Sequence, residues 1–471
     1  QTQPRDRCGA LWIRANNEST RNAERSIRAG DIGDTMDLQK LAEYNQNRQK
    51  TYRENRAYFL GRNPWLESRE RHWEPDNRIA IPFAKMAVED MAGYSAMPGY
   101  RTVSIDNVRT DEGATEDERL DSYIQEVREV EAFNDSDRLT AELYQEALVH
   151  GRAIEVFWYD DGPEFARIPE NEVELIYDGS LKPMIVGAVR FYDREERTPR
   201  KATVYDGDTI TQYERGGSGP FTEVESMPHP YERAPINVYG INSSGLPFFE
   251  SEKGLINAQD KLLSSSVNEV DRFNAVLALF PFKVDKQFVD KLRDMNVIDD
   301  LDQFERWPEY LEKDLGKITS FYADLADRLE RLFHKSIKVP DFSDESFIGT
   351  SRGVALAGQL LGLAFPAAQV DIYFDRGVYG RYELIGRGLN AGVARYNLDD
   401  YEITIDNKRN LPVDDLSKVQ IAQQLMGIVS QETILKMLPN SIVPDFEKEM
   451  ERLEGDPDMT LDVPEDTGND A

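Results

Sequence analysis

The stretch SRGVALAGQLLGLAFPAAQVDIYFDRGVYGRYELIGRGLNA, Ser351 to Ala391, decides the fold of this chain. Its apolar residues recur in steps of three or four, the spacing of one face of an α-helix. The stripe consists of Leu356, Leu360, Leu363, Ala367, Val370, Phe374, Val378, Tyr382, Ile385 and Leu389. A helix of this length would span about 60 Å at 1.5 Å per residue, well beyond the usual globular helix. We therefore expect something large to surround it.

Glycine and proline inside this helix predict its contacts. Each glycine costs about 1 kcal/mol relative to alanine, so a retained series favours close approach of neighbouring helices. The series is Gly353, Gly358, Gly362, Gly377, Gly380, Gly386 and Gly388. Pro366 predicts a kink. The alternative interpretation is a long core helix in an ordinary helical domain.

Two shorter helical patterns precede the long one and bracket an insert. The first, Phe249 to about Phe280, has apolar residues at every seventh position, namely Ile256, Leu263, Val270 and Leu277. The second, Phe321 to Ile337, carries Phe321, Leu325, Leu329, Leu332 and Phe333 on one face and is ended by Pro340. Residues 281–318 mix Pro, Trp and charged residues in short elements. Each apolar stripe predicts a helical partner.

The rest of the chain alternates helices with one β region, which makes the fold class α+β, mainly helical. Short alternating runs after Arg152 predict antiparallel strands: AIEVFWY, EVELIYD, IVGAVRFY, KATVYD and TITQYE. Helices are predicted before them at Met36–Leu60, Phe83–Tyr94 and Asp121–Val149. A strand at Tyr401–Asp406 and helices at Pro412–Ile428, Gln431–Leu438 and Pro444–Leu453 follow the long helix.

Length and composition exclude several classes of protein. A chain of 471 residues is too long for one compact core, and its 40% hydrophobic content argues against general disorder. Cys8 is the single cysteine, so no internal disulfide can form, and with only four histidines a Cys/His metal site is nearly excluded. No leader pattern opens the chain and no apolar run suits a membrane span, so we expect a soluble protein without targeting signals.

The charge is strongly acidic, with a net charge of −31. Tight DNA binding draws on clustered cations, so any DNA contact should be loose. The 18 Lys against 38 Arg add a second feature, a Lys-poor basic set. An acidic, Lys-poor surface is tolerable in concentrated salt, where the screening length falls to about 3 Å at 1 M. This pattern raises the hypothesis of a halophilic host, against the simpler interpretation of an ordinary acidic surface.

The common nucleotide-binding and metalloprotease motifs are missing from the sequence, which has no GxxxxGK[ST], no GxGxxG after a strand and no HExxH. The GGSG run at Gly216–Gly219 predicts a hairpin tip, since it lacks the lysine and helix of a phosphate loop. Asp206-Gly207-Asp208 predicts a β-turn rather than a cation site. His334 suits the C-terminal end of a helix better than a catalytic base. The chain is therefore predicted to be no enzyme and to need no cofactor or metal.

Four stretches resemble the portal proteins of tailed bacteriophages, specifically the branch typified by a Bacillus siphophage. They are NRIAIPFAKMAVEDMAGYSAMPG at Asn77–Gly99, the segments ALVHGRAIEVFWYDDG and VELIYDGSLKPMIVGAVRFY within Ala147–Tyr192, SIKVPDFSDESFIGTSRGVALAGQLLGL at Ser336–Leu363, and SQETILKMLPNSIVPDFEKEMERLE at Ser430–Glu454. The third is the most specific. The Arg-rich opening, the glycine-dense long helix and the acidic excess depart from the family pattern.

The resemblance implies a ring of twelve subunits around a DNA channel, each with wing, stem, clip and crown regions. The implied regions are an N-terminal wing over 1–247, a stem helix over 248–280, a clip over 281–320, a second stem helix over 321–337, a tunnel loop over 338–352, a long kinked wing helix with its strand over 353–411, crown helices over 412–454 and an acidic disordered tail over 455–471. Two striped helices that bracket an insert agree with this reading, because copies packed around an axis would bury their stripes.

The resemblance also implies two sites. The tunnel loop that approaches DNA would comprise Lys338, Val339, Pro340, Asp341, Phe342, Ser343, Asp344, Glu345, Ser346, Phe347, Gly349, Ser351 and Arg352. The clip facing terminase or the adaptor would present Lys286, Lys291, Arg293, Asp294, Arg306 and Trp307. The acidic tunnel-loop residues would repel phosphates and let DNA slide without readout of its sequence.

The implied partners are other copies of the chain, double-stranded DNA, the terminase large subunit, the head-tail adaptor, and the major capsid protein with its scaffold, but no membrane. The implied location is the portal vertex of the virion, with the host cytoplasm during assembly. Another ring component of the head-tail connector is one alternative. A carboxylate-dependent hydrolase is the other, and it would need converging acids with shifted pKa values in a pocket.

Overall fold

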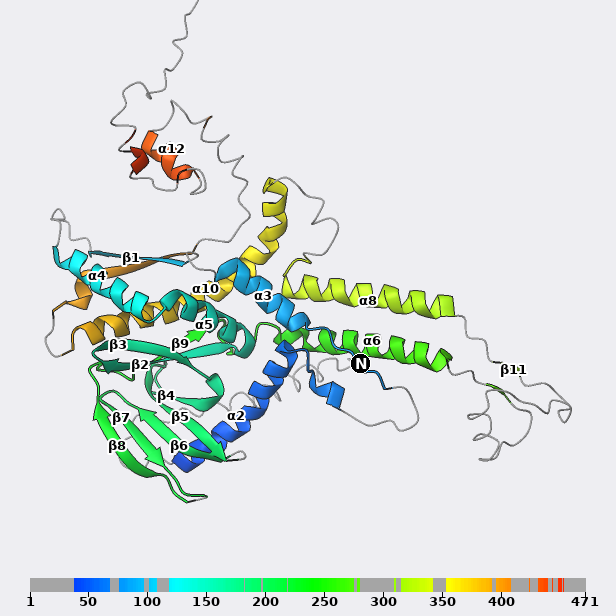
Figure 1. The fold of residues 1–471 in the computed structure, drawn as a ribbon, viewed down its shortest axis with the longest axis horizontal. Coiled ribbons are helices and arrows are strands. Elements are labelled where there is room, and N and C mark those ends of the chain that lie inside the picture. Colours follow the sequence, from blue (N-terminus) through cyan, green and yellow to red (C-terminus); the bar gives the residue numbers. More distant parts are fainter. Residues whose placement is uncertain are drawn as a thin grey trace, which may run out of the picture. The chain divides into compact units, whose positions relative to one another are not determined.

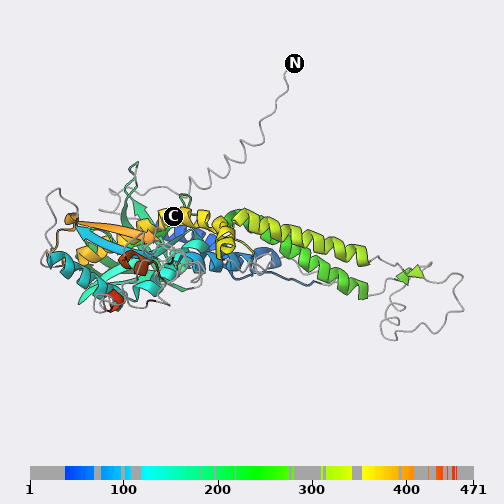
Figure 2. The same ribbon diagram turned by 90° about the horizontal axis from the view of Figure 1, so that it is seen from above.

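The computed structural model describes residues 38–67, 76–96, 101–107, 118–181, 183–195, 198–217, 219–274, 278–279, 309–310, 315–341, 353–391, 395–407 and 431–438, and near the end 423, 443, 448–450 and 452. The chain divides into two compact units, one of 1–339 with 366–409 and one of 340–365 with 410–471. The predicted class, α+β with helices predominant, is confirmed (Figures 1 and 2).

Five antiparallel strands form the larger sheet of the first unit, in the order β4-β5-β6-β7-β8. Their bounds are β4 Val173–Tyr177, β5 Ile185–Glu195, β6 Thr198–Tyr205, β7 Thr209–Glu214 and β8 Thr222–Pro228. The predicted runs EVELIYD, IVGAVRFY, KATVYD and TITQYE are all strands here. The edge strand β8 was not predicted, because its seven residues are all exposed and give little alternation of apolar and polar positions.

Both predicted turns join strands of this sheet. The side chain of Asp206 accepts hydrogen bonds from the backbone N–H groups of Asp208 and Thr209, at 2.8 and 2.6 Å. This geometry makes the Asp-Gly-Asp segment the β6–β7 turn, as predicted. The GGSG run lies between β7 and β8, where the N–H of Gly219 bonds to the carbonyl of Gly216, so the hairpin prediction is also confirmed.

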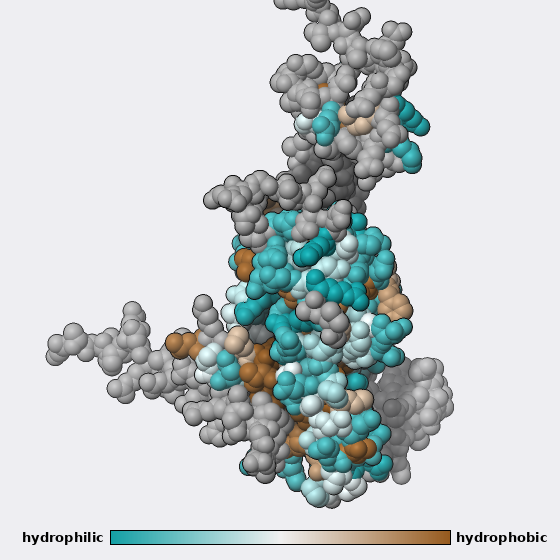
Figure 3. Space-filling model, turned by 90° about the vertical axis from the view of Figure 1, so that its left-hand side faces the viewer, coloured by the Kyte–Doolittle hydropathy of each residue, from teal (hydrophilic) through white to brown (hydrophobic). Residues whose placement is uncertain are grey.

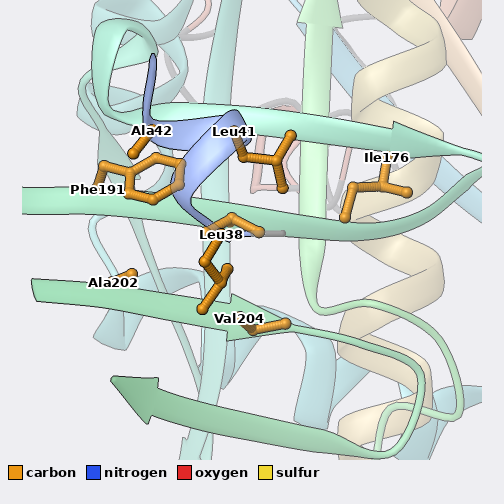
Figure 4. Packing of buried hydrophobic residues seen from close by; sticks show 8 residues of the cluster. Leu38, Leu41, Ala42, Ile176, Phe191, Ala202 and Val204 are labelled. Carbon is orange, nitrogen blue, oxygen red and sulfur yellow. The ribbon is translucent and has the colours of Figure 1, made fainter. Parts of the chain in front are cut away.

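Helix α2, Leu38–Phe59, covers one face of the larger sheet (Figure 4). Its apolar first turn packs on inward-facing residues of three neighbouring strands. The buried cluster comprises Leu38, Leu41, Ala42, Ile176, Val189, Phe191, Ala202 and Val204. Because side chains alternate between the faces of a strand, the same sheet offers a second apolar face on its other side.

That second face packs on a smaller antiparallel sheet, β3-β2-β9. Its bounds are β2 Arg152–Asp160, β3 Gly162–Ile168 and β9 Ile236–Gly240. Residues of both sheets share one core cluster, consisting of Ile154, Val156, Ile168, Val173, Ala188, Tyr205 and Ile236. The predicted run AIEVFWY is the central strand β2.

The first unit also contains three helices between α2 and these two sheets in sequence, namely α3 Phe83–Ser95, α4 Glu118–Phe133 and α5 Ser136–His150. The single helix predicted over Asp121–Val149 is wrong, because the chain breaks at Asn134 and Asp135. Asp135 is left-handed with φ 50°. The side chain of Asn134 accepts from the N–H of Phe165 at 3.0 Å and donates to the carbonyl of Pro163 at 3.2 Å. These bonds to β3 stabilise the break.

A two-stranded antiparallel sheet joins segments 300 residues apart. Strand β1, Arg101–Asn107, pairs along its whole length with β12, Tyr401–Asn407. The strand at Tyr401–Asp406 was predicted, whereas β1 was not. A 3₁₀ turn, η6 Leu398–Asp400, leads into β12.

The long helix α10 spans Gly353–Leu389 and contains Pro366. Every predicted stripe residue from Leu360 to Ile385 is buried, so the periodic prediction is confirmed over that range. Pro366 also marks the boundary between the two units. The kink itself stays a prediction.

The glycines of α10 admit close neighbours, but these are mostly not helices. A Cβ on Gly377 would lie 2.4 Å from the ring of Tyr239, and one on Gly380 would lie 2.4 Å from Oδ1 of Asn237. Both neighbours belong to strand β9, so the predicted approach of another helix is wrong at these positions. A Cβ on Gly362 would meet nothing within 4 Å. Its retention therefore has no packing explanation.

Helices α6 Lys253–Asn274 and α8 Leu315–Ile337 follow the sheets. The first starts after a 3₁₀ turn, η4 Glu250–Glu252, and is shorter than predicted. The second begins six residues before the predicted Phe321. Strand β10, Ala278–Leu279, lies in the last residues of the range predicted as the first helix, so that prediction is wrong there, and β11, Glu309–Tyr310, lies in the predicted insert.

Of the second unit, helix α12, Gln431–Met437, corresponds to the predicted helix at Gln431–Leu438. The predicted tail from 455 and most of the other two crown helices lie outside the described residues, as do residues 1–37. Among the described helices, none combines the length and apolarity needed to cross a membrane. Figure 3 shows a mainly hydrophilic face with hydrophobic residues gathered in a strip.

Candidate functional site

Helices α6 and α8 form an antiparallel pair, seen side by side in Figures 1 and 2. At one end, the hydroxyl of Ser336 near the end of α8 donates to the carboxylate of Glu252 just before α6, at 2.7 Å. At the other end, β10 pairs with β11, so the insert leaves and returns at one place. We call α6 and α8 together the helix pair.

An extended segment, residues 76–82, runs along α6 and was not predicted. The backbone N–H groups of residues 77, 79 and 81 bond to side chains of Asn268, Ser264 and Asp260, at 2.7, 2.9 and 3.0 Å. Two residues of extended chain cover about 6.6 Å, and four residues of helix rise about 6 Å, so the two repeats match. Burial raises the pKa of Asp260, against the lowering effect of its hydrogen bonds.

The inner side of the helix pair is well packed. Phe333 of α8 is buried against Phe83 of α3, with ring centroids 5.1 Å apart, and Ile337 is buried one turn further on. On α6, Ile256 is buried as the seven-residue stripe predicted. The pair is therefore anchored in the first unit at the end nearest the sheets.

Several large apolar residues on the outer side of the pair are left uncovered by the part of the chain that the structure describes. Phe321 is 62% exposed, Leu332 42% and Val270 52%, although the sequence places all of them on stripes that need a partner. Arg328 and Lys335 lie exposed beside them on α8. A protein in water rarely leaves such a run of large apolar side chains open unless another surface covers it.

The tunnel-loop residues begin where α8 ends. Lys338 is left-handed with φ 60°, which terminates the helix, and its side chain is exposed. Val339 is buried, and its carbonyl lies 2.9 Å from Nδ1 of His334. His334 lies in the last turn of α8, as predicted, and its ring also bonds to the chain just after the helix. Pro340 and Asp341 are half-buried, and the remaining tunnel-loop residues, Phe342 to Arg352, lie outside the described residues.

The clip residues predicted from the sequence all lie outside the described residues. These are Lys286, Lys291, Arg293, Asp294, Arg306 and Trp307. Of the predicted clip, residues 281–320, the structure describes strand β11 and the first six residues of α8. The exposure of those side chains and their role stay predictions.

A buried ion pair joins α10 to strand β2. The guanidinium of Arg381 bonds to the carboxylate of Glu155 at 2.7 Å, and their side chains are 3% and 0% exposed. Arg381 also donates to the hydroxyls of Ser136 and Thr140 on α5, at 3.0 and 2.6 Å. The hydroxyl of Tyr239 donates to Glu155 at 2.8 Å. The pair therefore fixes α10 against both α5 and the smaller sheet.

A second cluster joins α10 to β1. Arg101 bonds to Asp375 at 2.8 Å and to Asp371 at 3.2 Å, and its guanidinium lies over the ring of Phe374. Burial raises the pKa of Asp371 to about 7, against the lowering effect of Arg101, and Asp375 raises it further. Asn407 of β12 donates to Asp375 at 2.6 Å. Asp371 and Asp375 therefore fix the two-stranded sheet of β1 and β12 to helix α10.

Comparison with known proteins decides between the remaining readings. The family model described as "Phage portal protein, SPP1 Gp6-like" matches residues 38–460. The chain belongs to this phage portal family. The match includes the helix pair, both sheets, α10 and the range of both predicted sites.

Solved structures similar to this portal chain come from gene transfer agent particles. One is the virion of a native particle, with 12% sequence identity and a TM-score of 0.37, covering 76% of this chain and 89% of that one. Another is the neck of a native particle computed with C12 symmetry, with 10% identity, a TM-score of 0.37 and the same coverage. No curated protein matches the chain.

Family membership argues against the hydrolase alternative. Asp371 and Asp375 are the pair of acids that would best suit it, since the pKa of Asp371 is raised. In the portal chain, however, the guanidinium of Arg101 occupies the space between these carboxylates. The carboxylate of Glu155 is likewise already engaged, because it bonds to Arg381 and Tyr239. These acids stabilise joints between elements.

The sequence analysis did not identify the buried pair of Glu155 and Arg381 or the cluster of Arg101 with Asp371 and Asp375. Glu155 lies within the apolar run AIEVFWY, and a charged residue at the centre of such a run was the available signal. Arg381 and Asp371 lie beside the buried stripe of α10, where charged residues are ordinarily solvated. The expectation that the chain holds no metal or cofactor stays a prediction.

Proposed function

We propose that this chain is the portal subunit of a tailed virus or virus-like particle, and that about twelve copies close into a ring with a central DNA channel. Family membership supports the portal role. The ring is supported by the uncovered apolar side of the helix pair, where Phe321, Leu332 and Val270 are exposed. Neighbouring copies arranged around an axis would cover these residues.

In this proposal the helix pair is the stem, and the part of the predicted clip before α8, residues 281–314, docks the terminase large subunit during packaging and the head-tail adaptor afterwards. The β10–β11 pair supports a clip that projects from the stem, because it brings the chain just after α6 next to residues 309–310, shortly before α8. The predicted docking residues are those named above from Lys286 to Trp307. The wing, 1–247 with 353–411, would contact the major capsid protein and scaffold.

Double-stranded DNA would pass through the channel without sequence-specific contacts. The acidic chain supports this, since each phosphate contact by a cation adds affinity and slows movement. The tunnel loop would start at Lys338, whose exposed cation is followed by Asp341, Asp344 and Glu345. Passage of the genome at packaging and ejection would then need no catalysis by this chain, and the purified ring should not hydrolyse ATP.

Negative-stain imaging of the purified full-length chain tests the proposal. We expect rings with a stain-filled centre. In the infected cell the same ring would form in the host cytoplasm during assembly and would then lie at one vertex of the virion. Compact single particles at every salt concentration would rule out the portal ring. ATP hydrolysis by the purified ring would contradict the absence of enzymatic activity.

A halophilic host and membership of the Bacillus siphophage branch are finer proposals. The acidic, Lys-poor composition supports the first, because high salt screens the repulsion between acidic neighbours. Ring assembly should then require salt in the molar range. Full assembly in dilute buffer would contradict the halophile proposal and leave the portal proposal standing.

A further inference from the structure

Helix α10 has apolar residues on two faces within the first unit, and the described residues of the chain cover only one of them. The covered face is the stripe that includes Val370, Phe374 and Val378. On the opposite side, Ile372 is 72% exposed, Tyr379 43% and Tyr373 40%. A helix that is apolar all round is normally buried all round.

The exposed residues form one patch. Ile372, Arg376 and Tyr379 follow one another in steps of four and three, so they share a side of the helix, and Tyr373 flanks them. We call Ile372, Tyr373, Arg376 and Tyr379 the open face of α10. Tyrosine and arginine beside an apolar residue is the composition that protein interfaces favour over ordinary surface.

Arg376 differs from the other arginines of α10 in its ion pairing among the described residues. Of the three arginines of α10, Arg381 is paired with Glu155, and Arg387 with Glu232 and Glu383. The guanidinium of Arg376 is exposed and pairs with no carboxylate of the described residues. In a chain with 87 acidic and 56 basic residues, an isolated exposed arginine flanked by tyrosines calls for a carboxylate from outside.

We propose that the open face of α10 docks on an acidic surface of a neighbouring copy of this chain. A second copy can supply the carboxylate, because acidic residues outnumber basic ones by 87 to 56 in each chain. DNA fits the face less well, since phosphate recognition uses several cations and here one cation is flanked by apolar residues. The inference rests on the proposed ring and names one of its contacts.

The contact should be head-to-tail. In a two-fold contact between identical patches, Arg376 at the middle of the open face would meet Arg376 of the other copy, and like charges would repel. A contact between two different surfaces avoids this clash. Repeated around an axis, such a contact generates a ring when the rotation between neighbouring copies closes.

Charge reversal at Arg376 tests the docking. We compare the full-length wild type with Arg376→Glu and Tyr379→Ala by native mass spectrometry over a range of subunit concentrations at constant salt. Both residues are exposed, so circular dichroism should show unchanged folding. Each variant should need at least about tenfold more subunit for half-assembly, as interface residues of this type do. Arg138→Glu, an exposed arginine of α5 outside the face, is the matched control and should assemble as the wild type does.

A photo-cross-link identifies the occupant. Tyr379 is replaced by p-benzoylphenylalanine, and nitrogen-15-labelled and unlabelled chains are mixed before irradiation. Cross-linked peptides of mixed isotope, joined to an Asp- or Glu-rich segment, support the docking. The docking would be overturned if cross-links form only within one chain, if they form to another protein, or if none forms. If the wild type assembles and both substitutions assemble equally well, this inference fails while the portal ring stands, whereas a wild type that never assembles removes the proposed function itself.

Discussion

Replacing Arg381 with methionine should destabilise the first unit more than any exposed substitution. The side chain that is lost makes bonds to Glu155, Ser136 and Thr140 and lies 5.2 Å from the ring centre of Phe165. Methionine fills similar space but leaves the fully buried carboxylate of Glu155 without its cation. Removal of one partner of a buried ion pair costs about 3–5 kcal/mol.

A second substitution separates charge from packing. Glu155→Gln in the Arg381→Met background removes the unpaired charge and still offers an acceptor to Tyr239, whose hydroxyl donates to Glu155 at 2.8 Å. The double variant should therefore be more stable than Arg381→Met alone, because a neutral pair avoids burying a lone charge.

The assay is guanidinium unfolding followed by circular dichroism at one subunit concentration, since assembly shifts apparent stability by mass action. Arg138→Met, which removes an exposed arginine with exposed partners on α5, is the matched control and should leave the midpoint unchanged. A loss below about 1 kcal/mol for Arg381→Met, or a double variant that loses the sum of both single effects, would refute the reasoning.

Two further predictions follow from α10. Gly377→Ala should lower the free energy of unfolding by about 1–3 kcal/mol, because the new Cβ would lie 2.4 Å from the ring of Tyr239. Gly362→Ala, whose new Cβ meets nothing within 4 Å, should leave the free energy of unfolding unchanged or raise it. Equal effects of the two substitutions would contradict the close packing at Gly377. The raised pKa of Asp371, about 7 against an ordinary 3.8, means that the folded state keeps a proton that the unfolded state has lost, so this group makes stability fall as pH rises from about 4 to 7. Asp371→Asn should remove that part of the pH dependence and gain stability relative to the wild type at pH 8, as unfolding midpoints between pH 5 and 8 would show; an unchanged slope would refute it.

The sequence predicted elements whose signal is local and repeated. The stripe of α10 has ten positions, and a pattern of that length has few alternative explanations. The alternating runs of the larger sheet and the Asp206 turn were predicted for the same reason, because each is specified by neighbouring residues. The periods of a helix and a strand are properties of the backbone and need no tertiary information.

Elements that depend on distant partners were missed. The break at Asn134 is stabilised by bonds to Phe165 and Pro163, and nothing adjacent in sequence indicates them. Strand β1 exists through pairing with β12, about 300 residues away. The extended segment 76–82 gains its bonds from side chains of α6. In each case the stabilising contact is tertiary.

The candidate site divides in the same way. Apolar stripes that needed a partner could be predicted on both helices of the pair, and the exposure of Phe321 and Leu332 in the single chain follows from them. The buried pair of Glu155 and Arg381 could not be predicted, since charged residues are rarely buried and sequence does not show which two meet. The roles of the tunnel loop and clip came from family resemblance alone.

Native mass spectrometry of the full-length chain in concentrated and dilute salt tests the closure of copies around a channel most directly. We predict a dominant species of about twelve times the 53.9 kDa of one chain. A mass of one or two chains under both conditions would contradict the account, because the exposed apolar side of the helix pair would then have no neighbour to cover it.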